Sequence, residues 1–152
     1  MIRIRTFKEL MAHLVDEIAG LNHYIVAVRE EQFKEKVKDL STDQMPLLLA
    51  VIPSADGEGD HDNYSDRDNY LMFVLTRRES SDKNDDNMID DYESTQDAML
   101  AIKDKLIEIA ADCSSPYHQE MEHLIVDSFH MDPEFNFQGF DGWSCTFVCK
   151  TY

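Results

Sequence analysis

Glycine and cysteine are scarce in this sequence, and each shortage excludes a class of site. Five glycines among 152 residues leave little room for the glycine-rich loop with which many enzymes hold phosphates. The three cysteines, Cys113, Cys145 and Cys149, are an odd number at irregular spacing, which does not form a disulfide framework. We therefore expect reduced cysteines, as in a cytoplasmic protein.

Long hydrophobic runs are also missing. A membrane-spanning helix needs about 20 consecutive apolar residues, and no segment of this chain approaches that length. The first residues, Met1–Arg5, are basic but are followed by no apolar stretch, so we predict no signal peptide. The protein is expected to be cytoplasmic and to make no contact with membranes.

Positive charge is in short supply. Lysine and arginine number 14 against 31 aspartates and glutamates, which gives a formal net charge of −17. Such a surface repels phosphates, so we expect no direct binding of nucleic acid. Three interpretations of the acidity remain: solubility alone, a surface that keeps DNA at a distance, or a surface that imitates DNA.

What is present fits a single domain spanning residues 1–152, because 43% of the residues are hydrophobic and the length suits one core. We expect an α+β fold, a two-layer sandwich in which a mostly antiparallel sheet of about four strands carries two main helices on one face. The predicted elements are helices near 7–19 and 95–112 and strands near 46–53, 69–76, 122–129 and 143–151.

Apolar residues at helical spacing predict the two helices. In the first helix, Thr6 and Glu9 are spaced as in a capping box, and Gly20 is a plausible C-terminal stop. The second helix is predicted to begin near Ser94 or Thr95. Its expected buried stripe is Ala98, Ile102, Leu106, Ile109 and Cys113.

Two patterns predict strands. The continuous apolar runs Leu47–Ile52 and Tyr70–Leu75 are typical of central strands buried on both faces. The last segment alternates instead, and its expected inward face is Trp143, Cys145, Phe147 and Cys149. Between the first helix and the first strand the pattern is ambiguous. There His23–Val28 is a strand or an extension of the helix, and Glu30–Leu40 is predicted to be a short, mostly exposed helix.

Two acidic segments, near 54–69 and 79–92, are predicted to be long loops. The first contains Asp60, Asp62, Asp66 and Asp68, a density of carboxylates that calcium sites also show. The calcium-binding EF-hand pattern fails, however, because Ser65 stands where the pattern requires glycine and Leu71 stands where it requires glutamate. We therefore expect solvated loops and no metal site.

No residue pattern indicates catalysis. His118 and His123 lie near Glu120 and Glu122, but their order does not match the zinc-protease helix motif. The cysteines fall on apolar faces and are expected to be small core residues, not nucleophiles. We therefore predict a non-enzymatic protein with no catalytic residue and no cofactor.

Four aromatic residues gather near the end of the chain. They are expected either to fold back on the core or to mark a surface for a protein partner, since exposed aromatics are costly unless covered. The candidate interface residues are Phe135, Phe137, Phe140 and Trp143.

The element order resembles a known family. An amphipathic helix, an apolar strand, a long polar segment, a second apolar strand and a second helix precede a final strand that begins Gly142-Trp143-Ser144 and continues to Phe147. This layout is similar to that of phage neck and tail-completion proteins, the tail-terminator-like α+β family of phages and prophages. The resemblance rests on element order and size, without a diagnostic motif.

Membership of this family would imply a non-enzymatic structural protein at the junction of phage head and tail. Family members tend to form hexameric rings through which DNA passes, so the implied partners are further copies of the chain and other phage structural proteins. The implied location is the cytoplasm or a virion assembled there. The alternatives are an acidic DNA-mimic inhibitor, another small intracellular adaptor, or an enzyme of unrecognised type.

Overall fold

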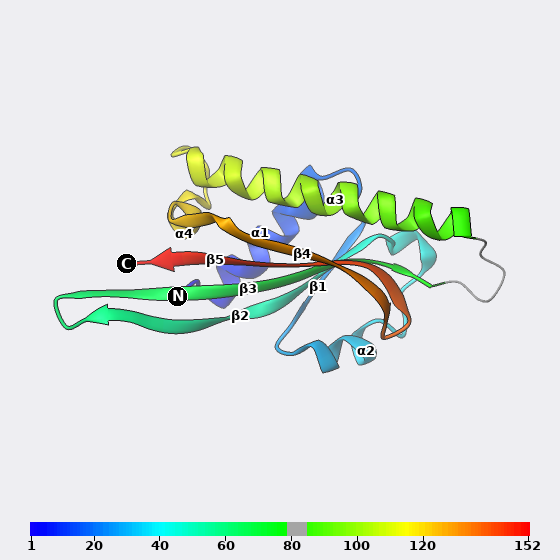
Figure 1. Ribbon diagram of the computed structural model, residues 1–152, viewed down its shortest axis with the longest axis horizontal. Helices are drawn as coiled ribbons and strands as arrows, with labels where there is room; N and C mark the ends of the chain where they lie inside the picture. Colours follow the sequence, from blue (N-terminus) through cyan, green and yellow to red (C-terminus); the bar gives the residue numbers. More distant parts are fainter. Residues whose placement is uncertain (79–84) are drawn as a thin grey trace.

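The computed structural model of this chain describes residues 1–78 and 85–152. One five-stranded sheet, with the order β1-β2-β3-β5-β4, forms its centre (Figure 1). β1 lies parallel to β2, and the other three neighbouring pairs are antiparallel. The α+β class is confirmed, but the prediction of about four strands in a mostly antiparallel sheet is wrong, because the sheet is mixed and has a fifth strand. The strands are β1 (His23–Ala27), β2 (Leu47–Asp60), β3 (Asn63–Arg77), β4 (Leu124–Phe137) and β5 (Phe140–Thr151).

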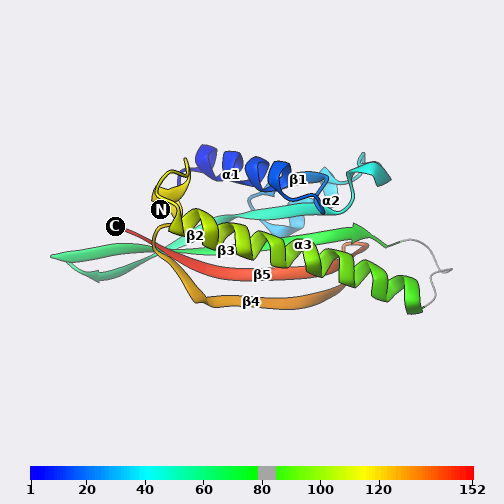
Figure 2. The ribbon, with the colours of Figure 1, turned by 90° about the horizontal axis from the view of Figure 1, so that it is seen from above.

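Helices cover the two faces of the sheet unequally. The long helices α1 (Ile4–Glu17) and α3 (Asp85–Ala111) pack on one face, and the single turn α2 (Phe33–Lys36) packs on the other face near one end (Figures 1 and 2). The remaining short elements are α4 (His118–Met121) and two 3-10 turns, Glu30–Gln32 and Thr42–Gln44. Among the described residues, no helix is both long and apolar enough to cross a membrane.

The main core lies between the sheet and its two long helices. Side chains alternate along β3, so that Tyr70, Met72 and Val74 face the helices. The ring of Tyr70 stacks on Phe147 of β5, with ring centroids 4.6 Å apart. Full burial of one such side chain stabilises the fold by about 1.5–3 kcal/mol, so this layer is the principal source of stability.

A smaller core lies on the opposite face, beneath α2. Phe33 of α2 packs against Phe140 and Phe137, at centroid distances of 5.0 and 5.8 Å. Phe137 also stacks on Phe73 at 4.6 Å. Hence the hairpin that joins β4 to β5 folds back over the sheet. For Phe137 and Phe140, the first of the two expectations, packing on the core, is therefore the one observed.

Residues 54–69, which we call the arm, form a β-hairpin that extends beyond the helices (Figure 1). The expectation of a long loop here is wrong, since register pairs run from Ser54 with Asn69 to Asp60 with Asn63. The turn is closed by Asp60, whose Oδ1 accepts hydrogen bonds from the N–H groups of Asp62 and Asn63. Most of the arm is exposed on both faces, so its strands carry no apolar alternation.

The second acidic segment is also not simply a loop. Residues 79–84 lie outside the described residues, and from Asp85 onward the chain belongs to α3. The predicted start near Ser94 or Thr95 is therefore wrong by about ten residues. Both hydroxyls donate to the carbonyl of Asp91, at 3.0 and 2.8 Å, which satisfies them inside the helix instead of at its cap.

Two further sequence predictions need correction. α1 begins at Ile4, with no side-chain cap at its N-terminus, so the expected capping box at Thr6 does not form. Cys113 is exposed, because α3 ends at Ala111 before reaching it. Cys145 and Cys149 are buried as predicted, and no cysteine is in a disulfide.

The expected core residues divide into two groups. Leu49, Phe73 and Leu106 are buried, and so is Phe147. By contrast, Val51 and Leu71 are only half-buried, although both lie in runs that were predicted to be covered on both faces. Both pack against the smaller core but stay partly open to solvent, and both line the groove described below.

Candidate functional site

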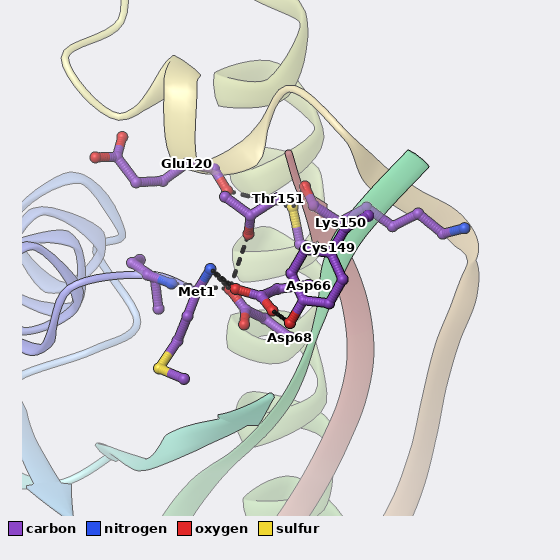
Figure 3. Close-up of polar contacts among 9 residues, drawn as sticks. Met1, Asp66, Asp68, Glu120, Cys149, Lys150 and Thr151 are labelled. Carbon is purple, nitrogen blue, oxygen red and sulfur yellow. Dashed lines mark hydrogen bonds and ion pairs between the residues drawn. The ribbon is translucent and has the colours of Figure 1, made fainter. Parts of the chain in front are cut away.

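The base of the arm is organised by one buried carboxylate, Asp68 of β3, which is 1% exposed. Its Oδ2 accepts hydrogen bonds from the N–H of Ile2 at 2.9 Å and from the hydroxyl of Thr151 at 3.1 Å (Figure 3). A buried carboxylate is tolerated only when donors compensate its lost hydration. This one therefore joins the segment before α1, the end of β5 and the arm.

A second carboxylate, Asp66, lies two residues away and is more exposed. Tyr64 donates a hydrogen bond of 2.7 Å to its Oδ1, and the α-amino group of Met1 lies 3.0 Å from its Oδ2 (Figure 3). The Tyr64 hydrogen bond and then the cationic amino group lower the pKa of Asp66. The same contact raises the pKa of Tyr64. On this side, the arm therefore already contacts one positively charged group of the same chain, the α-amino group of Met1.

Three buried polar atoms near this point have no hydrogen-bond partner within the described structure: Asp68 Oδ1, Tyr70 Oη and Glu120 Oε2. Burial raises the pKa of Tyr70 far above its usual range. Burial also raises the pKa of Cys149 to about 11, and its thiol donates to the carbonyl of Glu120 at 3.2 Å. A thiol held protonated in this way is a poor nucleophile.

The carboxylates considered as calcium ligands are divided between the two ends of the arm. Asp60 and Asp62 lie at the turn, whereas Asp66 and Asp68 lie at the base. Across residues 1–78 and 85–152, no three histidine, cysteine or acidic side chains are grouped in a way that could hold a metal ion.

The histidines near the end of the chain make local ion pairs. His118 and His123 both lie beside Glu122, at 3.6 and 3.3 Å, and His130 lies 2.9 Å from Asp132. Glu122 and His123 lie between α4 and β4, where they adjoin the buried Cys149, whereas His130 and Asp132 lie on β4. Burial and the nearby Glu122 charge raise the pKa of the Cys149 thiol, so this thiol stays protonated and is a poor nucleophile.

The four aromatic residues predicted as an interface lie in different environments. Phe137 and Phe140 pack in the smaller core, and Trp143 Nε1 donates to the carbonyl of Tyr92 at 3.0 Å. Phe135 alone among them is exposed, at 63%, with the guanidinium of Arg78 lying 4.2 Å from its ring centroid. As a candidate for a partner contact, the group is therefore reduced to Phe135 on β4.

A feature that sequence reasoning missed lies beside the arm. β1 pairs with β2 only from Leu47 to Val51, so within the described part of the chain the outer side of β2 has no neighbouring strand from Ile52 to Asp60. A groove of about 480 Å³ opens at this point on the uncovered face of the sheet. Its lining contains no charged residue: Val28, Val51, Ile52, Ser54, Asn69, Tyr70, Leu71, Ser128, Thr146, Phe147 and Val148.

A second groove, of about 680 Å³, separates α1 from α3. Its sides carry Glu17, Asp97, Asp104 and Glu108. Lys105, which also lines it, lies 3.5 Å from Glu17 and 3.2 Å from Glu108. The charges therefore bridge the two helices.

Comparison with known proteins does not assign the chain. No protein-family model matches the sequence, and a search of curated proteins found no match.

Proposed function

We propose that this protein is a non-enzymatic assembly protein of a phage or prophage particle, of the tail-terminator or head-tail connector type. In this role it acts through protein–protein contacts in a ring of identical subunits. The proposal combines the element order noted in the sequence with the open edges of the sheet.

The observation that carries the proposal is that the sheet has two different open sides. On one side, β4 has no outer neighbour among the described residues and exposes Val126 and Phe135. On the other side, β1 is the edge and is followed by α2. Head-to-tail contacts, which close a ring, require two such different surfaces on each subunit.

The charges of the two sides allow this contact. The edge strand β4 contains the acidic residues Asp127, Asp132 and Glu134. It contains no lysine or arginine, and one histidine, His130. The segment from Arg29 to Asp39 instead carries four basic and four acidic residues, and so has no net charge in a chain of −17. Placing β4 against this segment avoids much of the repulsion between two acidic subunits.

The acidity supports a passage for DNA. A lumen lined by carboxylates does not hold phosphates, so DNA would move through it without binding.

Light scattering coupled to size-exclusion chromatography tests the proposal. The protein should elute as a closed oligomer, and Phe135→Asp should shift it towards the monomer, because the substitution buries an unpaired charge in the contact. Ile89→Asp is the matched control, since Ile89 is equally exposed but lies on α3. Equal masses for the two variants would contradict a ring contact at Phe135.

One observation favours a second candidate, the DNA-mimic inhibitor. A mimic needs its carboxylates on a rigid surface, and Asp56, Glu58 and Asp60 lie on a paired strand instead of a loop. A mimic would be a monomer or dimer in the same light-scattering experiment.

A further inference from the structure

The outer side of β2 from Ile52 to Asp60 is an open strand edge. Next to it, β1 ends at Ala27 and the chain turns away into the 3-10 turn at Glu30–Gln32. An unpaired edge presents a row of backbone N–H and C=O groups that can pair with another extended segment. Among residues 1–78 and 85–152, no segment occupies the position that β1 would have along the arm if it were longer.

An uncharged groove adjoins the start of this edge. Val28, the residue after β1, is 58% exposed, and together with Val51, Ile52 and Leu71 it is among the apolar residues that line the 480 Å³ groove. The lack of any charged lining residue is unusual in a chain in which 30% of residues are charged. Depletion of charge is the feature that distinguishes the centre of a protein interface from its rim.

The two faces of β2 along the edge differ in chemistry. Alternation places Asp56, Glu58 and Asp60 on one face and Ala55, Gly57 and Gly59 on the other. A Cβ added at Gly57 would lie 3.1 Å from the ring of Tyr64, so this tyrosine covers the glycine face. One face therefore suits cationic side chains, and the other suits apolar side chains beside an aromatic ring.

We propose that this edge binds an extended segment of a partner protein, in which an apolar residue enters the groove and basic residues then alternate with apolar ones. The segment adds a strand beside β2, next to the end of β1. Its backbone pairs with residues 52–60, and its basic side chains lie beside Asp56, Glu58 and Asp60. The proposal rests on the protein-binding role proposed above, but not on ring formation.

Charge decides between the alternative occupants. The arm of a second copy would bring carboxylates against carboxylates, which is destabilising directly across strands. Nucleic acid would bring phosphates, which the arm repels. The other strand of the arm already holds a cation, the α-amino group of Met1 on Asp66. Glu58 likewise holds Lys150 at 2.8 Å.

A synthetic peptide tests the proposal directly. The probe has about eight residues, a common strand length, with leucine first and then alternating valine and lysine, so that the lysines lie on the same face of the strand as the leucine. Two N-methylated versions carry methyl groups on alternate backbone amides, one on the odd set and one on the even set. The two versions have the same charge and composition, but only one set of amides faces the edge in a given strand.

Fluorescence anisotropy at about 0.15 M salt should show binding of the probe by the full-length protein. One N-methylated peptide should bind at least about tenfold more weakly, because two or three lost hydrogen bonds contribute that much. The other should bind like the probe. Equal affinity of the two versions would overturn the proposal, since it would show attraction by charge alone.

Two pairs of exposed positions in the protein give matched variants. Val28→Asp should weaken binding at least about tenfold, the effect of placing a charge in an apolar contact, whereas Leu100→Asp on α3 should not. Asp56→Lys should weaken binding more than Asp104→Lys, which changes the net charge equally on α3. The proposal fails if each pair behaves alike.

Hydrogen exchange locates the contact. The bound probe should protect backbone amides within residues 52–60, and protection only elsewhere would overturn the proposal. These outcomes are independent of the ring. If the protein is a monomer and binds the probe with this pattern, only the ring proposal is contradicted. If it is an oligomer and does not bind the probe, only the proposed peptide-binding site on β2 is contradicted.

Discussion

The hydroxyl of Thr151 donates a hydrogen bond of 3.1 Å to Oδ2 of Asp68, although the two residues are 83 positions apart. The same oxygen accepts the N–H of Ile2. Both ends of the described chain therefore meet at the base of the arm, on a single carboxylate (Figure 3). This contact therefore holds the base of the arm against the segment before α1 and the end of β5.

Asp68→Ala should lower the free energy of unfolding by about 1–3 kcal/mol, because it leaves two donors without a buried acceptor. Asp127→Ala, at an exposed position on β4, should change it by less than about 0.5 kcal/mol. Urea denaturation measures both. Equal effects would show that the Asp68 hydrogen bonds contribute little.

Phe73→Ala should cost about 3–5 kcal/mol, the usual range for truncation of a buried phenylalanine. Phe73 is 3% exposed and stacks on Phe137, which in turn packs against Phe33. Phe135→Ala is the control and should have a small effect on stability. A loss below about 1 kcal/mol at Phe73 would contradict its place in the smaller core.

The pKa of Asp66 is lowered first by the hydrogen bond from Tyr64, so Tyr64→Phe should raise it towards the ordinary value. A carboxyl whose pKa is depressed by folding stabilises the fold above the ordinary pKa, about 3.9. That contribution is lost as pH falls through the lower, folded value. Carbon-13 NMR titration of the Asp66 carboxyl measures the shift. An unchanged pKa in Tyr64→Phe would show that the hydrogen bond is absent in solution.

One cysteine should react with a thiol reagent in the folded protein. Cys113 is exposed, whereas burial raises the pKa of Cys145 to about 12 and that of Cys149 to about 11. Thiolates are the reactive form, so the two buried thiols should react only after denaturation. Rapid labelling of all three in the native protein would contradict the burial of β5.

The sequence predicts those elements that bury a patterned surface. Leu47–Ile52 and Tyr70–Leu75 were recognisable as strands because both runs lie in the sheet core. The arm was not, because water covers it on both faces and its strands have no apolar alternation. The sequence does not predict the first ten residues of α3 for a similar reason. This stretch is rich in aspartate and has no continuous apolar stripe.

The candidate sites divide in a similar way. Phe135 and Phe137 look equivalent in sequence, and only the turn of the β4–β5 hairpin, with positive φ at Asn136 and Gln138, places one outside and the other in the core. The free edge of β2 depends on how far β1 extends, which was ambiguous in the sequence. Such features follow from tertiary packing and are not encoded in local pattern.

Electron microscopy of the assembled species tests the central claim most directly. Averaged images of the purified protein, at the concentration where light scattering gives the oligomer, should show closed rings with rotational symmetry and a central opening. Two-fold dimers without an opening, or a protein that stays monomeric at every concentration, would contradict an assembly function based on a ring of identical subunits.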